Sequence, residues 1–501
     1  MNFDSKRIFL FIPFCILVAL IFLEFLTLIY WIQLPFEGGS SEIQGLLAFA
    51  AHLECQIFYA PNFLVSLLVI VILYSWLILL MKLLLKKSGI IKIKLAGREL
   101  KLLKTMKKSI DNEHLKLFTS NKFLAFSISF SMILSMLYVL YAYAPLIINS
   151  EKFIGIDIPN YIEFMKNIRK YGLYYAFSSL SDRTLSVLVL YATSALSNMP
   201  ASLAVQFSPL WICPLVALAT YFYLYNAGLN KPICALACLF SAFSFINTIG
   251  VLAAFLSNMI AWILILFFSG LLLKSLCLSS KFSGFAAACA LVAVLFAHVY
   301  SWNLLVAVLL LFAFTHIFRV KSKPYIQNVK VITAILTPSI IAEIIRSHVL
   351  SKLFITTAAA VRICGAGLSP NYLFAFARHL DLAVNVHFKG LFASPPMLLL
   401  AAIGTFTILY NAWRQDFCDF MKCWIIATSL IFPFANHKIQ ARLLYFLPFH
   451  ILAALGLLYL TLYTRKRFRQ GIGKHLAFLM AILLILMNLN YGFNSMSRIS
   501  N

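Results

Sequence analysis

Acidic side chains are scarce in this chain: 16 Asp and Glu residues stand against 41 Lys and Arg in 501 positions. Charged residues of both signs make up only 11% of the sequence, whereas soluble domains average about 25%. This shortage excludes an ordinary water-soluble globular protein. The ten cysteines are scattered and show no spacing typical of a metal or redox pair. No internal repeat or low-complexity tract is evident either.

Hydrophobic residues are correspondingly abundant, at 62% of positions. They form continuous runs of about 17 to 25 residues, the length needed to cross roughly 30 Å of hydrocarbon. Because only helices and closed barrels satisfy their backbone in lipid, and the runs do not alternate, we predict an all-α polytopic transmembrane helix bundle. About 13 spans are expected, at residues 8–32, 61–84, 123–149, 208–226, 232–254, 255–276, 282–299, 301–318, 331–347, 391–413, 421–435, 442–463 and 475–491.

The positive charges gather between these spans in a way that predicts the topology. With the N-terminus cytoplasmic and the C-terminus extracytoplasmic, 28 of the 41 basic residues face the cytoplasm, as the positive-inside rule requires. This placement accounts for most of the net charge of +25, so we predict a lipid bilayer and no nucleic acid as partner. The expected location is the plasma membrane. The apolar stretch 184–199 must then not cross, because a crossing would invert every later loop.

The predicted organisation has three parts. Residues 1–84 form a two-span module with an external amphipathic segment. Residues 85–122 form a basic cytoplasmic connector suited to anionic headgroups. Residues 123–501 form the transmembrane core, with external loops at 150–207 and 348–390.

The first of these loops holds the leading candidate for chemistry, Asp157, in the stretch Gly-Ile-Asp-Ile-Pro-Asn-Tyr. Pro159 suits the first turn of a helix, and Tyr161, Phe164 and Ile168 continue at helical spacing along 159–170. The plainer interpretation is that Asp157 merely caps this helix. The functional interpretation rests on the scarcity of external acidic residues and on the order of the neighbouring parts.

That order resembles the GT-C superfamily of membrane glycosyltransferases, of the protein O-mannosyltransferase and aminoarabinose transferase type. Span 123–149 leads into Asp157 and helix 159–170, then Ser181-Asp182-Arg183, then the non-crossing stretch 184–199. The likeness covers roughly residues 123–465. It implies a GT-C-like core with external helices parallel to the membrane. The implied activity is sugar transfer from a polyprenyl (dolichyl-type) phosphate donor to a glycan, lipid or protein acceptor on the extracytoplasmic face.

The chain also departs from family patterns. No Asp-x-Asp pair occurs in the external loops, and no second acidic residue adjoins Asp157. The resemblance leaves a divalent cation, Mg²⁺ or Mn²⁺, open, but hard cations want several oxygen ligands, which puts an essential metal in doubt. The Trp-Trp-Asp signature is absent, which argues against the oligosaccharyltransferase branch.

The resemblance assigns roles to two ends of the core. Asp157 would be the base that accepts the proton of the attacking hydroxyl. Arg442, which is expected to open a late span on the outer side, would contact the lipid phosphate through its forked donors. His437 and Lys438 lie within the same seven residues and would assist it. The competing interpretation of Arg442 is an interfacial arginine that extends its charge toward water.

Several further residues are candidates for substrate contact. They are Tyr161, Asp182 and Arg183 in the first loop, His298 between two spans, Glu343 and Arg346 within a span, and Arg362 and Arg378 in the second loop. Ordinary alternatives exist for the last three groups. The histidine suits an aromatic membrane interface, the Glu343–Arg346 pair suits a structural ion pair facing the bundle, and the loop arginines suit simple solvation.

Two other functions compete with the glycosyltransferase. A transporter or lipid flippase suits a chain with this many spans and predicts paired broken helices and an internal repeat. A non-enzymatic scaffold would use the two-span module at 1–84 for docking.

Overall fold

The structure is a computed structural model of the chain. It describes residues 4–33, 48, 62–87, 121–149, 153–180, 182–317, 323–349, 378–387, 394–410, 413–468 and 470–500. Arg362, most of the loop 348–390 and residues 88–120 of the predicted connector lie outside these ranges.

Every regular element in the described residues is helical, as the sequence predicts. The elements are α1 (Asp4–Gln33), α3 (Asn62–Lys87), α5 (Asn121–Asn149), α6 (Ile158–Tyr171), α7 (Leu173–Ser178), α8 (Thr184–Ser197), α9 (Ala201–Gln206), α10 (Pro209–Asn226), α11 (Lys231–Ala242), α12 (Phe245–Ala253), α13 (Leu256–Leu278), α14 (Lys281–Ala297), α15 (Val299–Ile317), α16 (Lys323–Val349), η2 (Leu382–His387), α19 (Pro395–Leu409), α20 (Gln415–Ile431), η3 (Phe432–Phe434), α21 (His437–Tyr445), α22 (Phe449–Arg467) and α23 (Gln470–Ser500).

All thirteen predicted spans coincide with helices. By length and composition, nine of the described helical segments can cross a membrane, or ten if α21 and α22 form one span bent by 52°. The predicted spans 8–32, 282–299 and 391–413 correspond to shorter apolar helices, described as Cys15–Ile29, Lys281–Ala297 and Pro395–Leu409. The chain is therefore an all-α polytopic membrane protein, with fewer full-length spans among the described helices than the thirteen expected.

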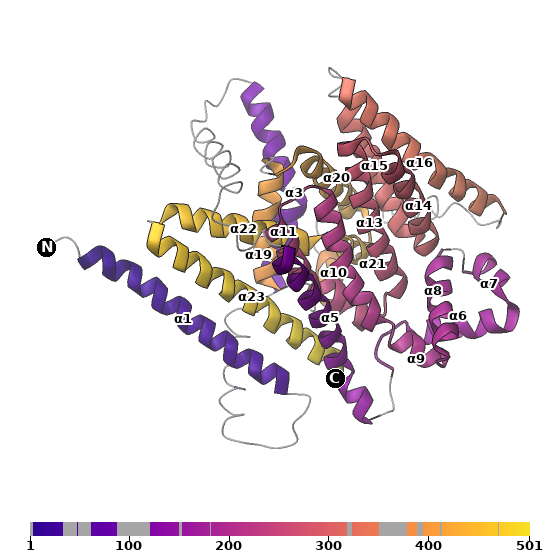
Figure 1. Cartoon of the computed structure of the whole chain (residues 1–501), viewed down its shortest axis with the longest axis horizontal. Helices are drawn as coiled ribbons and strands as arrows, with labels where there is room; N and C mark the ends of the chain where they lie inside the picture. Colours follow the sequence, from indigo (N-terminus) through magenta and orange to yellow (C-terminus); the bar gives the residue numbers. More distant parts are fainter. Residues whose placement is uncertain are drawn as a thin grey trace.

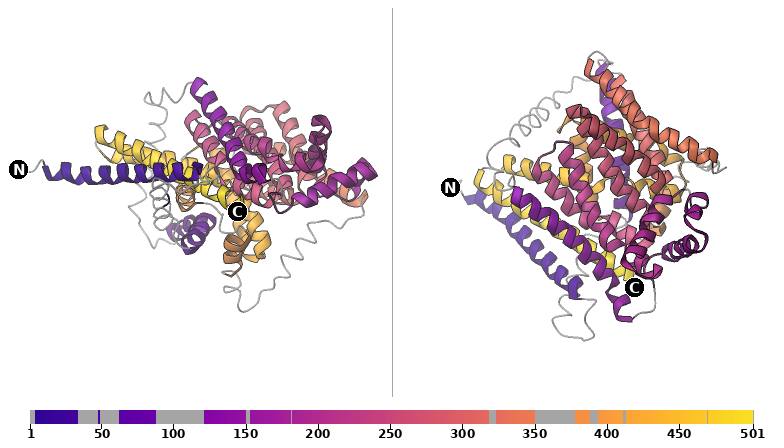
Figure 2. Two further views of the ribbon diagram at one scale, coloured as in Figure 1. Left: turned by 90° about the horizontal axis from the view of Figure 1, so that it is seen from below. Right: turned by 45° about the vertical axis from the view of Figure 1, so that its right-hand side comes forward.

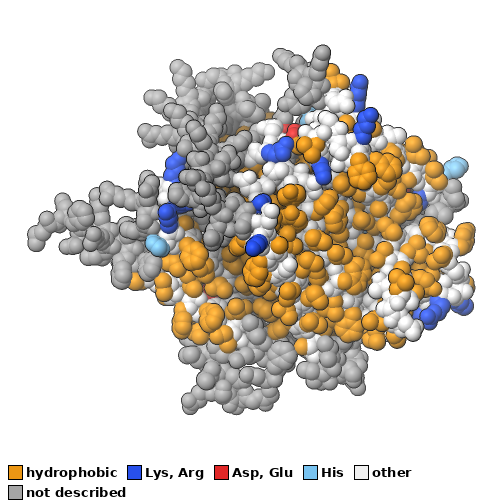
Figure 3. Space-filling model, in the orientation of Figure 1, with side chains coloured by type: hydrophobic (Ala, Val, Ile, Leu, Met, Phe, Trp, Pro, Cys, Tyr) orange, Lys and Arg blue, Asp and Glu red, His pale blue; other side chains and the backbone are white. Residues whose placement is uncertain are grey.

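The helices differ in how deeply they lie in the bundle. Buried residues make up 89% of the most apolar 18-residue stretch of the span Lys231–Ala253, but only 28% of that in Leu64–Met81 and in Ile326–His348. Figures 1 and 2 accordingly show α10, α11 and α13 inside the bundle, with α16 at one margin and α1 along α23 at another. Hydrophobic side chains cover much of the visible face, and the Lys and Arg side chains lie mainly toward its edges (Figure 3). This is the distribution expected of a surface in contact with lipid.

Two glycines allow α19 and α22 to touch backbone to backbone. A Cβ atom at Gly404 would lie 1.9 Å from the carbonyl oxygen of Leu452, and one at Gly456 would lie 1.9 Å from that of Leu400. Small residues at a membrane helix crossing permit this close approach and gain packing contact in return. The pair therefore anchors α22 firmly against α19.

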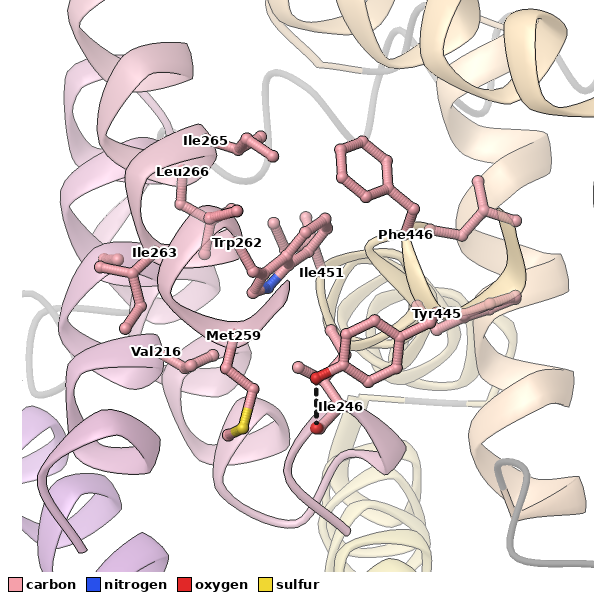
Figure 4. Close-up of a cluster of buried hydrophobic side chains, with 14 of the residues drawn as sticks. Val216, Ile246, Met259, Trp262, Ile263, Ile265, Leu266, Tyr445, Phe446 and Ile451 are labelled. Atoms are coloured by element: carbon pink, nitrogen blue, oxygen red, sulfur yellow. Dashed lines mark hydrogen bonds between the residues drawn. The ribbon is translucent and has the colours of Figure 1, made fainter. Parts of the chain in front are cut away.

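The core next to the outer end of the bundle joins α12, α13 and the α21–α22 bend. Trp262 packs edge-on against Phe446 at a ring-centroid distance of 5.4 Å. The Tyr445 hydroxyl donates a hydrogen bond to the carbonyl of Ile246 at 2.9 Å (Figure 4), and Trp424 Nε1 donates to the carbonyl of Phe446 at 3.1 Å. These contacts fix the position of the bend and therefore of α21, for which the sequence predicts a loop before residue 442 and the start of the span 442–463 after it.

Helices α6 to α9 form a separate group at one margin of the bundle (Figure 1). α8 has 14 residues and ends at Asn198, whose φ of 52° places it in the left-handed region. At 1.5 Å per residue this helix is about 21 Å long, too short for roughly 30 Å of hydrocarbon. The prediction that 184–199 does not cross stays a prediction, because α19, which is expected to span, has a similar length of 15 residues.

Loops that the topology assigns to one side meet at one end of the structure. Lys231 Nζ donates to Asn121 Oδ1 at 2.7 Å, and Arg414 Nη2 donates to Cys277 Sγ at 3.0 Å. At the other end the Val299 amide donates to the carbonyl of Asp182 at 3.1 Å. We call these the inner and outer ends, following the predicted orientation.

Candidate functional site

The outer end holds Asp157 through its backbone rather than its side chain. The amide of Ile156 donates to the carbonyl of Leu252 at 3.1 Å, and the amide of Asp157 donates to that of Ala253 at 3.2 Å. These two bonds tie the segment before α6 to the tip between α12 and α13. Gly155 has a φ of 120°, and a Cβ atom there would lie 2.8 Å from that of Ala254. The tie therefore requires glycine at 155, both for its backbone conformation and for space.

A buried glutamine fixes the same segment from the other side. The carboxamide of Gln206 accepts from the Ile154 amide and donates to the Ile154 carbonyl, each at 3.1 Å. Gln206 is 1% exposed, so both polar halves of its side chain are satisfied by this one residue. An unmatched buried amide would be costly. The position of Asp157 is thus fixed by α9 on one side and by α12–α13 on the other.

The carboxylate of Asp157 does not act as a helix cap. Asp157 occupies the N-cap position of α6, but its side chain makes no capping hydrogen bond. It instead accepts from the side-chain amide of Asn160 at 3.3 Å. Partial burial raises the pKa of Asp157 above its ordinary value, and the charges of Arg183 and Arg442 and the hydrogen bond from Asn160 oppose that rise. A carboxylate with a raised pKa beside two arginines has the electrostatic character of a functional group.

Asp182 and Arg183 form an ion pair beside Asp157. Arg183 donates to Asp182 Oδ2 through Nη2 at 2.8 Å and Nε at 3.2 Å, and both side chains remain partly exposed. Burial would raise the pKa of Asp182, but the hydrogen bond and charge of Arg183 outweigh it and lower that pKa. The guanidinium of Arg183 lies 5.8 Å from the ring of Phe164 on α6. Arg183 therefore links the start of α8 to α6 and places a cation near Asp157.

His298 lies at the break between α14 and α15. The Ser301 amide donates to His298 Nδ1 at 3.3 Å, so the neutral ring carries its hydrogen on Nε2. Burial and the nearby charges of Arg442 and Arg183 lower the pKa of His298 to about 3, against the opposing charge of Asp182. The imidazole is therefore neutral at physiological pH and can donate a hydrogen bond without adding charge.

Arg442 completes this group from the far end of the sequence. It lies on the exposed face of α21, and its guanidinium sits over the ring of Tyr300 at 5.0 Å. Asn436 caps α21 by accepting from the amide of Ile439 at 3.1 Å. The charge of Arg442 acts on both Asp157 and His298. Three segments separated by more than a hundred residues thus meet at one place.

A second set of basic residues adjoins Arg442. Lys438 is exposed one helical turn earlier on the same helix. The ring of His437 lies 6.0 Å from that of His379, because η2 and the residues before it pack against α21. Arg378, also exposed, precedes His379 directly. The structure thus brings together the predicted residues His437, Lys438 and Arg378 from two separate loops.

The remaining predicted residues lie in other settings. Tyr161 is 2% exposed and its hydroxyl is 2.7 Å from Ser257 Oγ, which links α6 to α13. Glu343 and Arg346 form a buried pair on α16, with Nε–Oε2 at 2.6 Å and Nη2–Oε1 at 2.8 Å. The geometry is that of the predicted structural ion pair.

The site does not fit a bound divalent metal. Among the described residues, no three His, Cys, Asp or Glu side chains lie close enough together to hold one. The two carboxylates beside Arg183 are also poorly placed for the task, because Asp182 already accepts two hydrogen bonds from that guanidinium. A hard cation prefers six or more oxygen ligands.

Sequence reasoning missed the residues that position Asp157. Gly155 carries a weak signal, since a glycine two residues before a candidate carboxylate indicates a special backbone conformation. Gln206 carries none, because its partner is a backbone group 52 positions away. Tyr300, which follows His298 by two residues, provides the ring on which the guanidinium of Arg442 lies.

The fold and this site define an integral membrane protein with a mixed-charge centre at one end of its helix bundle. No family model matches the chain, and no curated protein matches it by sequence. Among solved structures, the oligosaccharyltransferase of Archaeoglobus fulgidus in its apo form is similar, with a TM-score of 0.48 and 13% sequence identity. The match covers 73% of this chain and 56% of that one.

Proposed function

We propose that this protein is a membrane glycosyltransferase that moves a sugar from a polyprenyl phosphate donor to an acceptor hydroxyl at the outer end of the bundle. The observation that carries the proposal is the convergence of Asp157, His298 and Arg442. A general base, a neutral hydrogen-bond donor and a phosphate-binding cation are the groups that such a transfer needs.

Each residue takes one role in this reaction. The Asp157 carboxylate accepts the proton of the acceptor hydroxyl as its oxygen bonds to the anomeric carbon of the sugar. The bond between that carbon and the phosphate oxygen breaks, and the departing phosphate keeps the electron pair. Arg442 stabilises the charge that builds on this phosphate, since a guanidinium offers two parallel donors to phosphate oxygens. Nε2–H of His298 can donate to the substrate.

The electrostatics support Asp157 as the base. Partial burial raises the pKa of its carboxyl, and a base with a pKa closer to ambient pH accepts a proton more readily in the transition state. The charges of Arg183 and Arg442 oppose that rise and so favour the ionised carboxylate. The backbone bonds from Ile156 and Asp157 hold it in place before substrate arrives, which is how preorganised groups contribute most.

Transfer of labelled sugar from a polyprenyl-phosphate donor tests the proposal, with purified protein in nanodiscs and an acceptor extract. Asp157→Asn should lower the rate by about 10²- to 10⁴-fold, the contribution of a general base. Asp416→Asn, at the inner end, is the matched control and should stay within about twofold of the parent, as surface substitutions away from a site do. Full transfer by Asp157→Asn would refute the role of Asp157.

A second function, transport or lipid flipping, has one observation in its favour. Two interrupted helices, α11–α12 and α21–α22, meet where Tyr445 bonds to Ile246. Broken helices that face each other are a feature of transporter sites. Protein in liposomes that scrambled a fluorescent polyprenyl lipid, yet transferred no sugar, would favour this function over the enzyme.

A further inference from the structure

There are more basic residues next to Arg442 than the binding of one phosphate requires. We call Arg378, His379, His437 and Lys438 the distal basic patch. Lys438 lies at position i−4 from Arg442, so their Cβ atoms are about 5–6 Å apart on one helix face. Both side chains are exposed, whereas Gln440, Leu444 and Tyr445 are buried elsewhere on α21. The two cations therefore point away from the protein core together.

The patch draws on two segments that are far apart in sequence. The contact between the rings of His379 and His437, at 6.0 Å, brings Arg378 to the N-terminal half of α21. The burial of His437, together with the charges of His379 and Lys438, lowers the pKa of His437. Protonation of His437 beside Lys438 and His379 is therefore unfavourable in the free protein, and an anion bound between them would relieve this repulsion.

The charge balance also indicates more than one negative group. Arg183 is already paired with Asp182, so it offers little to a ligand. Along α21 and the segment that packs on it, Arg378, Lys438 and Arg442 stand against Asp381, which gives 3 − 1 = +2. A sugar joined to a lipid through one phosphate is a diester with a single negative charge. A sugar joined through a diphosphate carries two.

We propose that the distal basic patch is a second phosphate subsite, so that the lipid donor of this protein is a diphosphate. Arg442 then binds the phosphate that leaves with the lipid and adjoins the sugar, and Lys438, with Arg378 and the two histidines, binds the phosphate next along the carrier. The inference rests on the proposed function, which supplies the lipid-linked sugar as ligand, and it specifies that this donor is a diphosphate. An anionic phospholipid headgroup offers the same phosphate chemistry, so the test separates the two sources.

Binding of farnesyl phosphate and farnesyl diphosphate to the full-length protein, in nanodiscs of neutral phosphatidylcholine, measures the second subsite directly. The diphosphate should bind about tenfold more tightly, since one additional charge-assisted contact is of that order. Lys438→Gln should reduce this ratio to about twofold or less, with Arg378→Gln in the same direction. Lys166→Gln is the matched control, because Lys166 is an exposed lysine of α6 outside the patch, and its ratio should equal that of the parent.

Three outcomes overturn the subsite: equal affinity for both probes, a diphosphate preference that survives in Lys438→Gln, or its loss in discs that contain phosphatidylglycerol. The last of these would assign the patch to phospholipid headgroups. The readout needs no catalysis, so it is independent of the proposed enzyme. Selective diphosphate binding without any sugar transfer would refute the glycosyltransferase and keep the subsite, whereas transfer from a monophosphate donor without diphosphate preference would do the reverse.

Discussion

The two ends of the helix bundle contain the same types of residue in opposite settings. At the inner end, Arg414 donates to Cys277 Sγ, which donates to Asp416 Oδ2 at 3.7 Å. The guanidinium of Arg414 also fills the space over Gly228, where a Cβ atom would lie 2.1 Å from Nη1. At the outer end, the guanidinium of Arg442 lies over the ring of Tyr300, and Asp157 accepts a hydrogen bond from the side-chain amide of Asn160. Arg414 is thus held by contacts with a thiol and with the backbone at Gly228, whereas Arg442 lies on a ring, an arrangement that leaves its forked donors available for the proposed ligand.

Exchange of the two arginines for glutamine gives the largest expected contrast. Arg442→Gln should lower kcat for sugar transfer by about 10²- to 10³-fold, because it removes a cation from the departing phosphate. Arg414→Gln should leave kcat within about twofold, as expected for a residue remote from the chemistry. Steady-state kinetics on both variants decide the comparison. Equal losses from the two substitutions would mean that the outer arginine acts only through the fold.

Two glycines test whether the backbone tie matters to the chemistry. Gly155→Ala should lower the transfer rate by about 10- to 100-fold, since a displacement near 1 Å of a catalytic group has an effect of this size. Gly172→Ala is the control, because Gly172 also has a positive φ, of 76°, but nothing lies within 4 Å of its Cβ position. Both variants place a side chain at a positive φ, which L residues rarely adopt. If both lose the same activity, strain in the outer helices explains the loss and the contact with Ala254 does not.

The pH dependence of the outer end provides a smaller effect. The base must be ionised, so kcat/KM should fall as pH drops through the pKa of Asp157, which partial burial has raised. Arg183 lowers that pKa, so Arg183→Gln should move the acidic limb to higher pH by about one unit. The limb is read from kcat/KM against pH, which reports the free enzyme. An unchanged limb in this variant would assign the titration to another group.

The sequence alone predicts much of this arrangement. Long apolar runs locate the helices because lipid requires satisfied backbone groups. Charge counting predicts that Asp157, His298 and Arg442 lie on one side of the membrane, and all three meet at the outer end of the structure. The spacing of Tyr161, Phe164 and Ile168 predicts a helix, which the structure shows as α6; Tyr161 and Ile168 are each 2% exposed there.

Features that depend on contacts between distant segments could not be predicted from the sequence. The interpretation of Asp157 as a helix cap is wrong in its side-chain geometry, because backbone bonds to α12–α13 orient the carboxylate instead. Arg442 does not open a straight span, because Tyr445 and Phe446 bind α12 and α20 and the chain bends after them. The meeting of His379 with His437 follows from the packing of η2 on α21. No local pattern encodes such pairs.

The bend separates α21 from α22, and the two helices should differ in the substitutions that they tolerate. Below it, Gly456 lies so close to the backbone of Leu400 that any side chain larger than hydrogen must displace α19. Above it, the side chains of Lys438 and Arg442 are exposed, so charge rather than volume should decide which substitutions these two positions tolerate. A saturation scan of 437–467 should therefore reject bulky side chains at Gly456 and reject the loss of positive charge at Lys438 and Arg442. This pattern would show that α22 is constrained by its packing on α19, whereas the two basic residues of α21 contribute through their charge.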